Sequence, residues 1–414
     1  MLNIFFYIII SFVILNFFWE QYLAWLNRKR MSPEIPAALH GIYDEKQYAS
    51  QQAYQKENSR FGLISGTFSF LIIIVLLIVG GFGWWDTFLR DYTGHFLWLP
   101  LLFLGTFALA NQLIETPFDW YDTFVIEEKF GFNKTTRKLF VTDWMKGLLL
   151  SMVIGGMVLS AILWIYQYTG SWFWLLAWGV ITGFSLLMSL FYSEWIVPLF
   201  NKQKPLEAGA LRDSIEDFAN KAGFKLTDIY VMDGSKRSTK ANAYFTGMGK
   251  KKRIVLFDTL MDELETEEIV AVLAHEIGHY KKKHVWQSLI LSIGFTGLTL
   301  YILSLFLNNA QLAEALGGEI PSFHLGLIGF SFLFAPLSAL TGLFFNYLSR
   351  KNEYEADAYA AGFGLGDALI SSLKKMSVKS LSNLNPHPWV VFCHYSHPTL
   401  LQRMEGIKAQ VWRL

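Results

Sequence analysis

Two histidines and a glutamate lie at the spacing of a zinc hydrolase site. His275, Glu276 and His279 form the pattern His-Glu-x-x-His. The surrounding residues predict a helix, on which side chains four positions apart project from one face. Two imidazoles on one face bind Zn²⁺, and the glutamate between them acts as the general base of a metalloprotease. Only 9 of the 414 residues are histidine, so a chance match is unusual. The spacing therefore predicts hydrolytic zinc chemistry.

A zinc hydrolase needs a third protein ligand and one open position for water. The extended pattern with a third nearby histidine ligand is absent, because lysines occupy 281–283. The best candidate is Glu353, and Asp357 shares its helix face four residues later. A carboxylate at Asp357 would accept the free ring N–H of a ligating histidine. A carboxylate pair capped by Arg350 at a helix end explains the same two residues without a metal.

The composition is that of a membrane protein. Hydrophobic residues make up 53% of the chain and charged residues 17%, which is more apolar than a soluble domain of this length. The net charge of +1 gives no reason to expect nucleic-acid binding. The single cysteine, Cys393, excludes an internal disulfide framework.

Seven apolar segments reach the length of about 20 residues that a membrane crossing takes. The first is interpreted as an uncleaved anchor, because its basic residues follow it rather than precede it. The seven segments lie near 3–19, 62–84, 95–114, 144–167, 171–197, 285–307 and 322–347.

The basic residues between these segments predict their orientation. The connections 20–61 and 115–143 hold six and four lysines or arginines, and the alternate connections hold only Arg90. By the positive-inside rule, the N-terminus faces out and the C-terminus faces the cytoplasm. The insert 200–284 and the tail after 348 then share the cytoplasmic side, where the predicted ligands meet.

The sequence of the insert 200–284 predicts a series of helices and strands. Residues 207–222 have helical spacing and stop at Gly223. Three short runs rich in β-branched and aromatic residues, at 228–232, 242–246 and 253–257, predict a small sheet. Thr266 is the expected N-cap of the helix that carries the two histidines.

An ordered series of segments resembles the type I CAAX prenyl proteases, which are integral-membrane zinc endopeptidases. Together the segments run from about 115 to 408, and the first two apolar segments fit by position and hydropathy alone. The matching segments are 117–118, 123–129, 131–133, 198–201, 233–238, 242–245, 253–260, the helix with the two histidines, 353–360 and 395–398.

The resemblance implies a role for each residue of the expected metal site. His275, His279 and Glu353 would ligate zinc. Glu276 would be the general base and then the general acid, and Asp357 would orient a ligand from behind. The implied fold is mostly α, with seven transmembrane helices and a cytoplasmic gluzincin-like zinc protease domain that contains a small β-sheet.

The resemblance also implies residues that meet the substrate. Asn242 would lie on an edge strand that holds the peptide backbone by β-augmentation. His397 and Arg403 would flank the scissile carbonyl as polarising groups, although one histidine of a tail with several is more often structural. Lys240 and Ala241 depart from the family, which often has His-Ser before the Asn-Ala-Tyr segment.

The expected division of the chain has four parts. Residues 1–199 hold five transmembrane helices, and 200–284 form the cytoplasmic insert. Residues 285–348 hold the sixth and seventh helices, and 349–414 carry the third zinc ligand. Lysines 281–283 are expected to contact lipid headgroups. The bacterial inner membrane is favoured because the loops and tail are short, and the endoplasmic reticulum also fits a cytoplasm-facing site.

Three functions are compatible with the sequence. The first is removal of C-terminal residues beyond a prenylated cysteine. The second keeps the fold and chemistry but acts on non-prenylated membrane proteins in quality control. The third is a seven-span transporter or receptor without enzymatic activity, which would place functional polar residues within the spans. The partners expected for an enzyme are a peptide or protein substrate, possibly prenylated, and membrane lipid, without nucleic acid.

Overall fold

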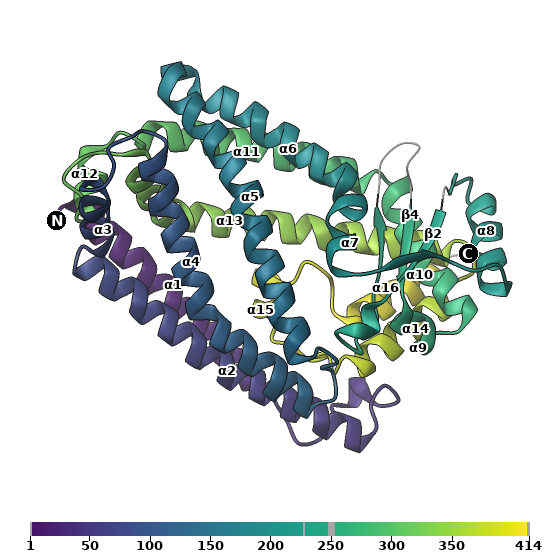
Figure 1. Cartoon of the computed structure of the whole chain (residues 1–414). Helices are drawn as coiled ribbons and strands as arrows, with labels where there is room; N and C mark the ends of the chain where they lie inside the picture. The colour runs from purple at the N-terminus through teal and green to yellow at the C-terminus, as the bar shows by residue number, and fades with distance from the viewer. Residues whose placement is uncertain (1, 227, 247–252, 412–414) are drawn as a thin grey trace.

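The computed structural model describes residues 2–226, 228–246 and 253–411. Long helices occupy one side of the molecule, and a small sheet with shorter helices occupies the other (Figure 1). Within the described residues, six helical segments are long and apolar enough to cross a membrane. They are Ile4–Arg28, Glu45–Ile78, Trp98–Glu127, Arg137–Phe200, His284–Phe306 and Phe323–Ala361.

The segment Arg137–Phe200 contains two long helices. Helix α5 (Arg137–Thr169) and helix α6 (Phe173–Trp195) are joined by a short 3₁₀ turn, and α7 (Val197–Phe200) follows. Gly170 in this turn has φ +53°, a conformation that L-residues rarely adopt. The chain reverses there, so α5 and α6 pack against each other.

The first helices extend beyond their apolar parts. Helix α1 covers Ile4–Arg28, α2 covers Glu45–Ile78 and α3 covers Gly81–Arg90. Helix α2 starts in a polar stretch, where Asp44 and Gln47 form a capping box. Hydropathy alone therefore missed its first half. Helix α4 (Trp98–Tyr121) contains Pro117 and continues as a π-helical turn, Asp122–Glu127.

The described strands form one four-stranded sheet with the order β1-β2-β4-β3. The strands are β1 (Gln203–Pro205), β2 (Asp228–Met232), β3 (Ala243–Thr246) and β4 (Arg253–Phe257). Strands β2 and β4 are parallel, and the other two pairs are antiparallel. Strand β3 therefore lies at an edge and begins one residue after Asn242, which was expected on an edge strand, whereas β1 was not predicted.

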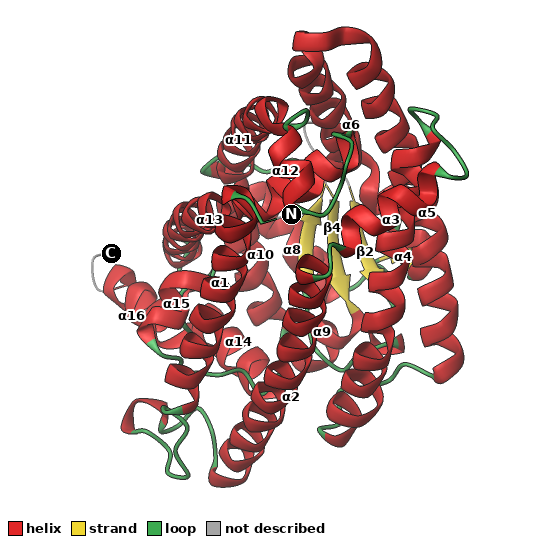
Figure 2. Cartoon of the chain, turned by 90° about the vertical axis from the view of Figure 1, so that its left-hand side faces the viewer, coloured by secondary structure: helices red, strands yellow, loops and turns green. Residues whose placement is uncertain are grey.

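One face of the sheet packs on α8 (Ala210–Lys221) and α10 (Thr266–Lys281) in the largest buried apolar cluster. The N-cap of α10 is Glu265, one residue earlier than expected, because Glu265 and Glu268 form a capping box. Helix α9 (Asp258–Glu263) precedes α10. Figure 2 shows that strands are confined to this one small sheet and that helices make up most of the rest.

Helix α13 (Phe323–Ala361) connects the two sides of the molecule (Figure 1). Its 39 residues span about 58 Å at 1.5 Å per residue. It follows α11 (His284–Phe306) and the short α12 (Ala310–Ala315). Three further helices complete the chain, namely α14 (Gly366–Lys379), α15 (Pro388–His394) and α16 (Leu400–Val411).

Candidate active site

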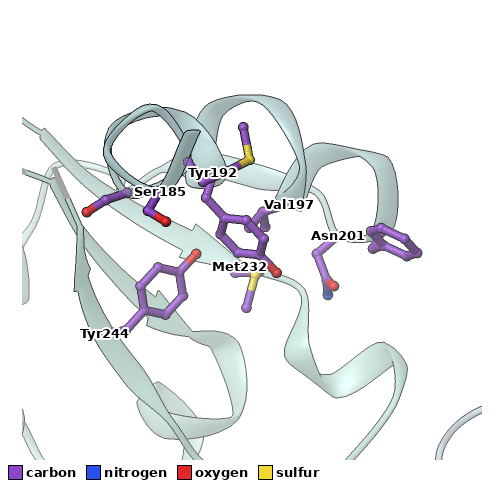
Figure 3. A pocket seen from close by; sticks show the side chains of 9 residues that line it. Ser185, Tyr192, Val197, Asn201, Met232 and Tyr244 are labelled. Carbon is purple, nitrogen blue, oxygen red and sulfur yellow. The ribbon is translucent and has the colours of Figure 1, made fainter. Parts of the chain in front are cut away.

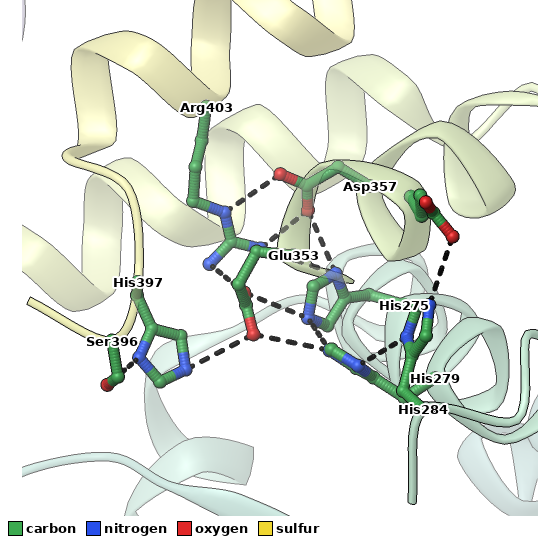
Figure 4. Close-up of polar contacts among 9 residues, drawn as sticks. His275, His279, His284, Glu353, Asp357, Ser396, His397 and Arg403 are labelled. Atoms are coloured by element: carbon green, nitrogen blue, oxygen red, sulfur yellow. Dashed lines mark hydrogen bonds and ion pairs between the residues drawn. The ribbon is translucent and has the colours of Figure 1, made fainter. Parts of the chain in front are cut away.

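The two helices that carry the expected ligands approach each other closely at Gly278. A Cβ atom at this position would lie 3.1 Å from the Cα of Ala356 and 3.1 Å from the Cβ of Tyr359. These contacts are tighter than ordinary van der Waals contacts, so any larger residue at position 278 would push α13 outward. The close approach places Glu353 of α13 against the histidines of α10 (Figure 4).

The three expected metal ligands converge. The Nε2 atoms of His275 and His279 are 3.1 Å apart. Glu353 places Oε2 3.5 Å from His275 Nε2 and Oε1 3.3 Å from His279 Nε2. Zinc–ligand bonds of about 2.1 Å at tetrahedral angles separate the donor atoms by about 3.4 Å. These three are the group of histidine and acidic side chains, among the described residues, whose ligand atoms lie close enough to hold a metal ion.

One oxygen of this site is left without a hydrogen-bond donor. Glu353 is only 4% exposed, and its Oε2 atom is buried and accepts no hydrogen bond from any residue that the structure describes. The nearest fixed cation is Arg403, whose Nη1 atom is 3.5 Å away. A buried carboxylate oxygen without a donor is costly, and a bound cation removes that cost. The residues present therefore fit a metal ion.

Asp357 and Arg403 stand behind His275. The Nδ1 atom of His275 is 2.8 Å from Asp357 Oδ1, so its N–H donates to the carboxylate and leaves Nε2 free for the metal. Arg403 binds both oxygens of Asp357, through Nε at 2.9 Å and Nη2 at 2.6 Å. Burial lowers the pKa of Arg403, but the hydrogen bonds to Asp357 outweigh it and raise the pKa, so the guanidinium stays charged.

The guanidinium of Arg403 thus orients a carboxylate in this structure. Its expected action on the scissile carbonyl remains a prediction. Arg350 does not cap the pair of Glu353 and Asp357, as the metal-free alternative required. It donates instead to the carbonyls of Val391 and Tyr395, which fixes the chain around α15.

His397 reaches the same site from the loop before α16. Its Nε2 atom lies 3.2 Å from Glu353 Oε1, and its side chain is 63% exposed. The Nδ1 atom contacts the hydroxyl of Ser396 at 3.0 Å. The imidazole of His397 therefore lies at the rim of the site, beside the buried carboxylate of Glu353 and open to solvent.

Glu276 is half-buried on α10 between the two histidines. Burial lowers the pKa of His279, but the hydrogen bond and charge of Glu353 outweigh it, and the charge of Glu276 adds to them. The pKa of His279 is therefore raised.

Asn242 directly precedes the edge strand β3. Its carbonyl accepts from the backbone N–H of Phe257, and its side-chain oxygen accepts from the N–H of Ala243. Lys240, where the sequence departs from the family pattern, forms hydrogen bonds that hold this segment in place. Lys240 Nζ lies 2.8 Å from Glu127 Oε2 and 3.2 Å from the hydroxyl of Tyr54, which connects this segment to α2 and to the π-helical turn after α4.

A separate apolar cavity of about 810 Å³ lies between α6, α7 and the sheet (Figure 3). The side chains that line it include Met188, Tyr192, Met232 and Tyr244. None of the expected metal ligands lines it, so it is distinct from the metal site.

The sequence interpretation missed two residues, His284 and Glu355. His284 Nδ1 lies 3.1 Å from His279 Nδ1, and its Nε2 lies 3.1 Å from Glu355 Oε2. A third histidine five residues after His279 was a visible signal.

Comparison with known proteins assigns the chain to a family. Residues 24–202 match the family model for the N-terminal part of CAAX prenyl proteases, described as five membrane helices, and residues 205–411 match that of peptidase family M48. The chain belongs to peptidase family M48. A rice protein named CAAX prenyl protease 1 homolog is 36% identical, over 97% of this chain and 96% of its own length.

Two further M48 relatives agree. CAAX prenyl protease 1 of Saccharomyces cerevisiae is 34% identical, over 97% of this chain and 94% of its own length. The crystal structure of S. mikatae Ste24p matches with a TM-score of 0.93 and 33% identity, over 98% of this chain and 100% of that chain. This M48 member is an integral-membrane metalloprotease of the CAAX prenyl protease type. The transporter or receptor alternative is therefore excluded.

Proposed function

We propose that the metal is zinc and that His275, His279 and Glu353 hold it. The observation that carries this proposal is the convergence of two imidazole nitrogens on a buried carboxylate whose Oε2 has no hydrogen-bond donor. Two histidines and one carboxylate are a ligand set typical of zinc proteases. When bound, zinc polarises a water molecule and brings its pKa to about 7.

Each of the residues around the ligands then has a separate role in the reaction. Glu276 takes the proton of the attacking water and returns it to the leaving amine. Asp357, held by Arg403, fixes the tautomer of His275 so that Nε2 faces the metal. His397, exposed at the rim of the site, donates to the oxygen on which negative charge develops.

The proposed substrate is the C-terminal peptide of a prenylated protein, from which the residues beyond the lipidated cysteine are removed. The names of the relatives support this substrate class. Among the described strands β3 lies at the edge of the sheet, next to Asn242, and this edge offers backbone groups to an extended peptide by β-augmentation. Non-prenylated membrane proteins, degraded by the same chemistry, are the alternative substrate class.

We further propose seven membrane crossings, because α5 with 33 residues and α6 with 23 residues are each long enough for one. In this arrangement, 1–199 and 285–348 carry the crossings. The segments 200–284 and 349–414 form the catalytic part on the cytoplasmic side, as the positions of the basic residues favour. Helices α10, α14 and α16 share one buried apolar cluster, which supports the assignment of 200–284 and 349–414 to a single catalytic part. The bacterial inner membrane stays a prediction from loop length.

The test is mass spectrometry of a farnesylated C-terminal CaaX peptide and its unprenylated twin after incubation with detergent-purified protein. Cleavage by the wild type and not by Glu276→Ala is expected, with preference for the farnesylated peptide. Equal cleavage of both peptides would favour the non-prenylated substrate class. If neither peptide is cut by zinc-loaded protein, the proposed CAAX substrate is wrong.

A further inference from the structure

The second histidine ligand has an unusual partner behind it. The Nδ1 atom of His279 faces another histidine, His284, at 3.1 Å. The first ligand, His275, instead faces the carboxylate of Asp357 directly. A metal-bound histidine needs an acceptor for its second ring N–H, because that hydrogen bond fixes both the tautomer and the orientation of the ring. His284 can serve only if its own Nδ1 carries no proton.

The structure supplies a group that fixes the proton of His284 on the other nitrogen. His284 Nε2 lies 3.1 Å from Glu355 Oε2, so the N–H of Nε2 donates to a carboxylate. The Nδ1 atom of His284 then holds a lone pair that accepts from His279 Nδ1–H. The protons balance along the whole chain, and His279 Nε2 is left free to face Glu353.

The backbone between the two histidines is shaped for this contact. Lys283 has φ +62°, in the left-handed region, and separates α10 from α11. A continuous helix would point residue 284 away from residue 279, since five positions correspond to about 500° of rotation. The break at Lys283 allows the His284 ring to return to His279, and His284 is only 5% exposed. A non-glycine residue in this conformation costs energy, which the surrounding contacts must offset.

We propose that His284 and Glu355 are positioning residues for the metal ligand His279, acting through the hydrogen-bond chain His279–His284–Glu355. Figure 4 shows the contact between His279 and His284. The inference rests on the proposed zinc site. His284 is not itself a fourth ligand, because its Nδ1 atom meets the side of the His279 ring opposite to the metal-facing Nε2. The two ligands on α10 are thus oriented by different groups, His275 by the carboxylate of Asp357 and His279 by the imidazole of His284.

The experiment measures zinc affinity of the full-length protein in detergent by competition with a chromophoric chelator. His284→Phe keeps a ring of similar size but removes the acceptor, and zinc affinity should fall about 10- to 100-fold. His284→Asn retains an oxygen near the position of Nδ1 and should recover most of the affinity. The absorption spectrum of the Co²⁺-substituted protein should change in the Phe variant and stay close to wild type in the Asn variant.

Glu355 gives a second variant that does not disturb the interior. Its side chain is 40% exposed, and Glu355→Ala should weaken zinc binding by a smaller factor than His284→Phe. The matched control is Lys351→Ala. Lys351 is the other partner of Glu355, with Nζ 3.8 Å from Oε1, and it contacts neither histidine. The control variant should bind zinc as the wild type does.

Two results would overturn the inference. One is zinc affinity of His284→Phe and Glu355→Ala within twofold of the wild type. The other is an equal loss in the Phe and Asn variants, because that would mean that the His284 ring acts by its shape alone. Failure of the proposed function looks different: the wild-type protein itself would then bind no zinc, or would keep it after Glu353→Ala.

Discussion

Helix α13 carries a buried histidine–carboxylate cluster near each end, and the two clusters differ in how their hydrogen-bonding groups are matched. Near the N-terminal end, His324 is 0% exposed and its Nε2 lies 2.6 Å from Oδ1 of Asp86, which is 1% exposed. Arg90 binds Oδ2 of the same carboxylate at 2.8 Å. Each oxygen of Asp86 therefore has a donor, and only Nδ1 of His324 is left without a partner in this cluster.

Near the C-terminal end, acceptors face one another. The Nε2 atoms of His275 and His279 converge on Glu353, whose Oε2 has no hydrogen-bond donor. Burial and a histidine–acid pair are common to both clusters, so neither feature identifies a metal site. The distinguishing feature is the convergence of three acceptors whose donors lie behind them. The Asp86 cluster should thus contribute to stability, and the Glu353 cluster should contribute metal binding.

The largest effect is expected from Glu353→Ala. Removing one of three ligands should abolish stoichiometric zinc binding and with it peptide cleavage, because a zinc hydrolase needs three protein ligands. Metal content by mass spectrometry of the purified variant checks this. An unchanged zinc content would mean that Glu353 is not the third ligand and would remove the contrast with Asp86.

The next effect separates metal binding from catalysis. Glu276→Ala should keep one zinc per chain but lose about 10²- to 10⁴-fold in turnover, because it removes the general base without removing a ligand. The check is a cleavage assay together with metal analysis of the same preparation. Retained activity at full zinc content would rule out the assignment of Glu276.

At the other end of α13, Asp86→Ala should cost stability and leave the metal in place. Removing the carboxylate leaves the buried Nε2–H of His324 without its acceptor, which costs about 1–3 kcal/mol. Thermal unfolding in detergent should show a lower midpoint, whereas the zinc content should match the wild type. Loss of zinc in a variant that is still folded would contradict the division between the two clusters.

The smallest effect is expected at a third cluster, formed by Tyr54, Glu127 and Lys240. Its donors and acceptors are matched, as at Asp86, but the Lys240 side chain is 36% exposed. Lys240→Ala should therefore cost about 1 kcal/mol or less. Because Lys240 lies two residues before Asn242, KM for a peptide should rise more than kcat falls. A change in zinc affinity would contradict this placement.

The sequence predicted the parts of the site that depend on local spacing. His275, Glu276 and His279 follow from one helical turn. Glu353 was the candidate third ligand because its segment was predicted on the same side of the membrane as the histidines. The pairing of Arg403 with Asp357 could not be predicted, because it depends on how α16 packs on α13. The contact of His284 with His279 depends on the left-handed residue Lys283, which propensities for lysine do not suggest.

The same limit applies to the fold. Apolar length and β-branched runs predicted the long helices and three of the four strands that the described residues contain. Strand β1, with the sequence Gln-Lys-Pro, has no β-forming pattern and exists only because it pairs with β2. The polar half of α2 likewise forms a helix without an apolar signal, and its capping box at Asp44 marks where it begins.

The most direct test of the central claim is crystallography of the detergent-purified protein with anomalous diffraction at the zinc absorption edge. The account predicts one strong anomalous peak about 2.1 Å from His275 Nε2, His279 Nε2 and a Glu353 oxygen, with no peak at Asp86 and His324. A zinc peak coordinated by His284 or His397 in place of Glu353, or no peak at α10 in active protein, would contradict it.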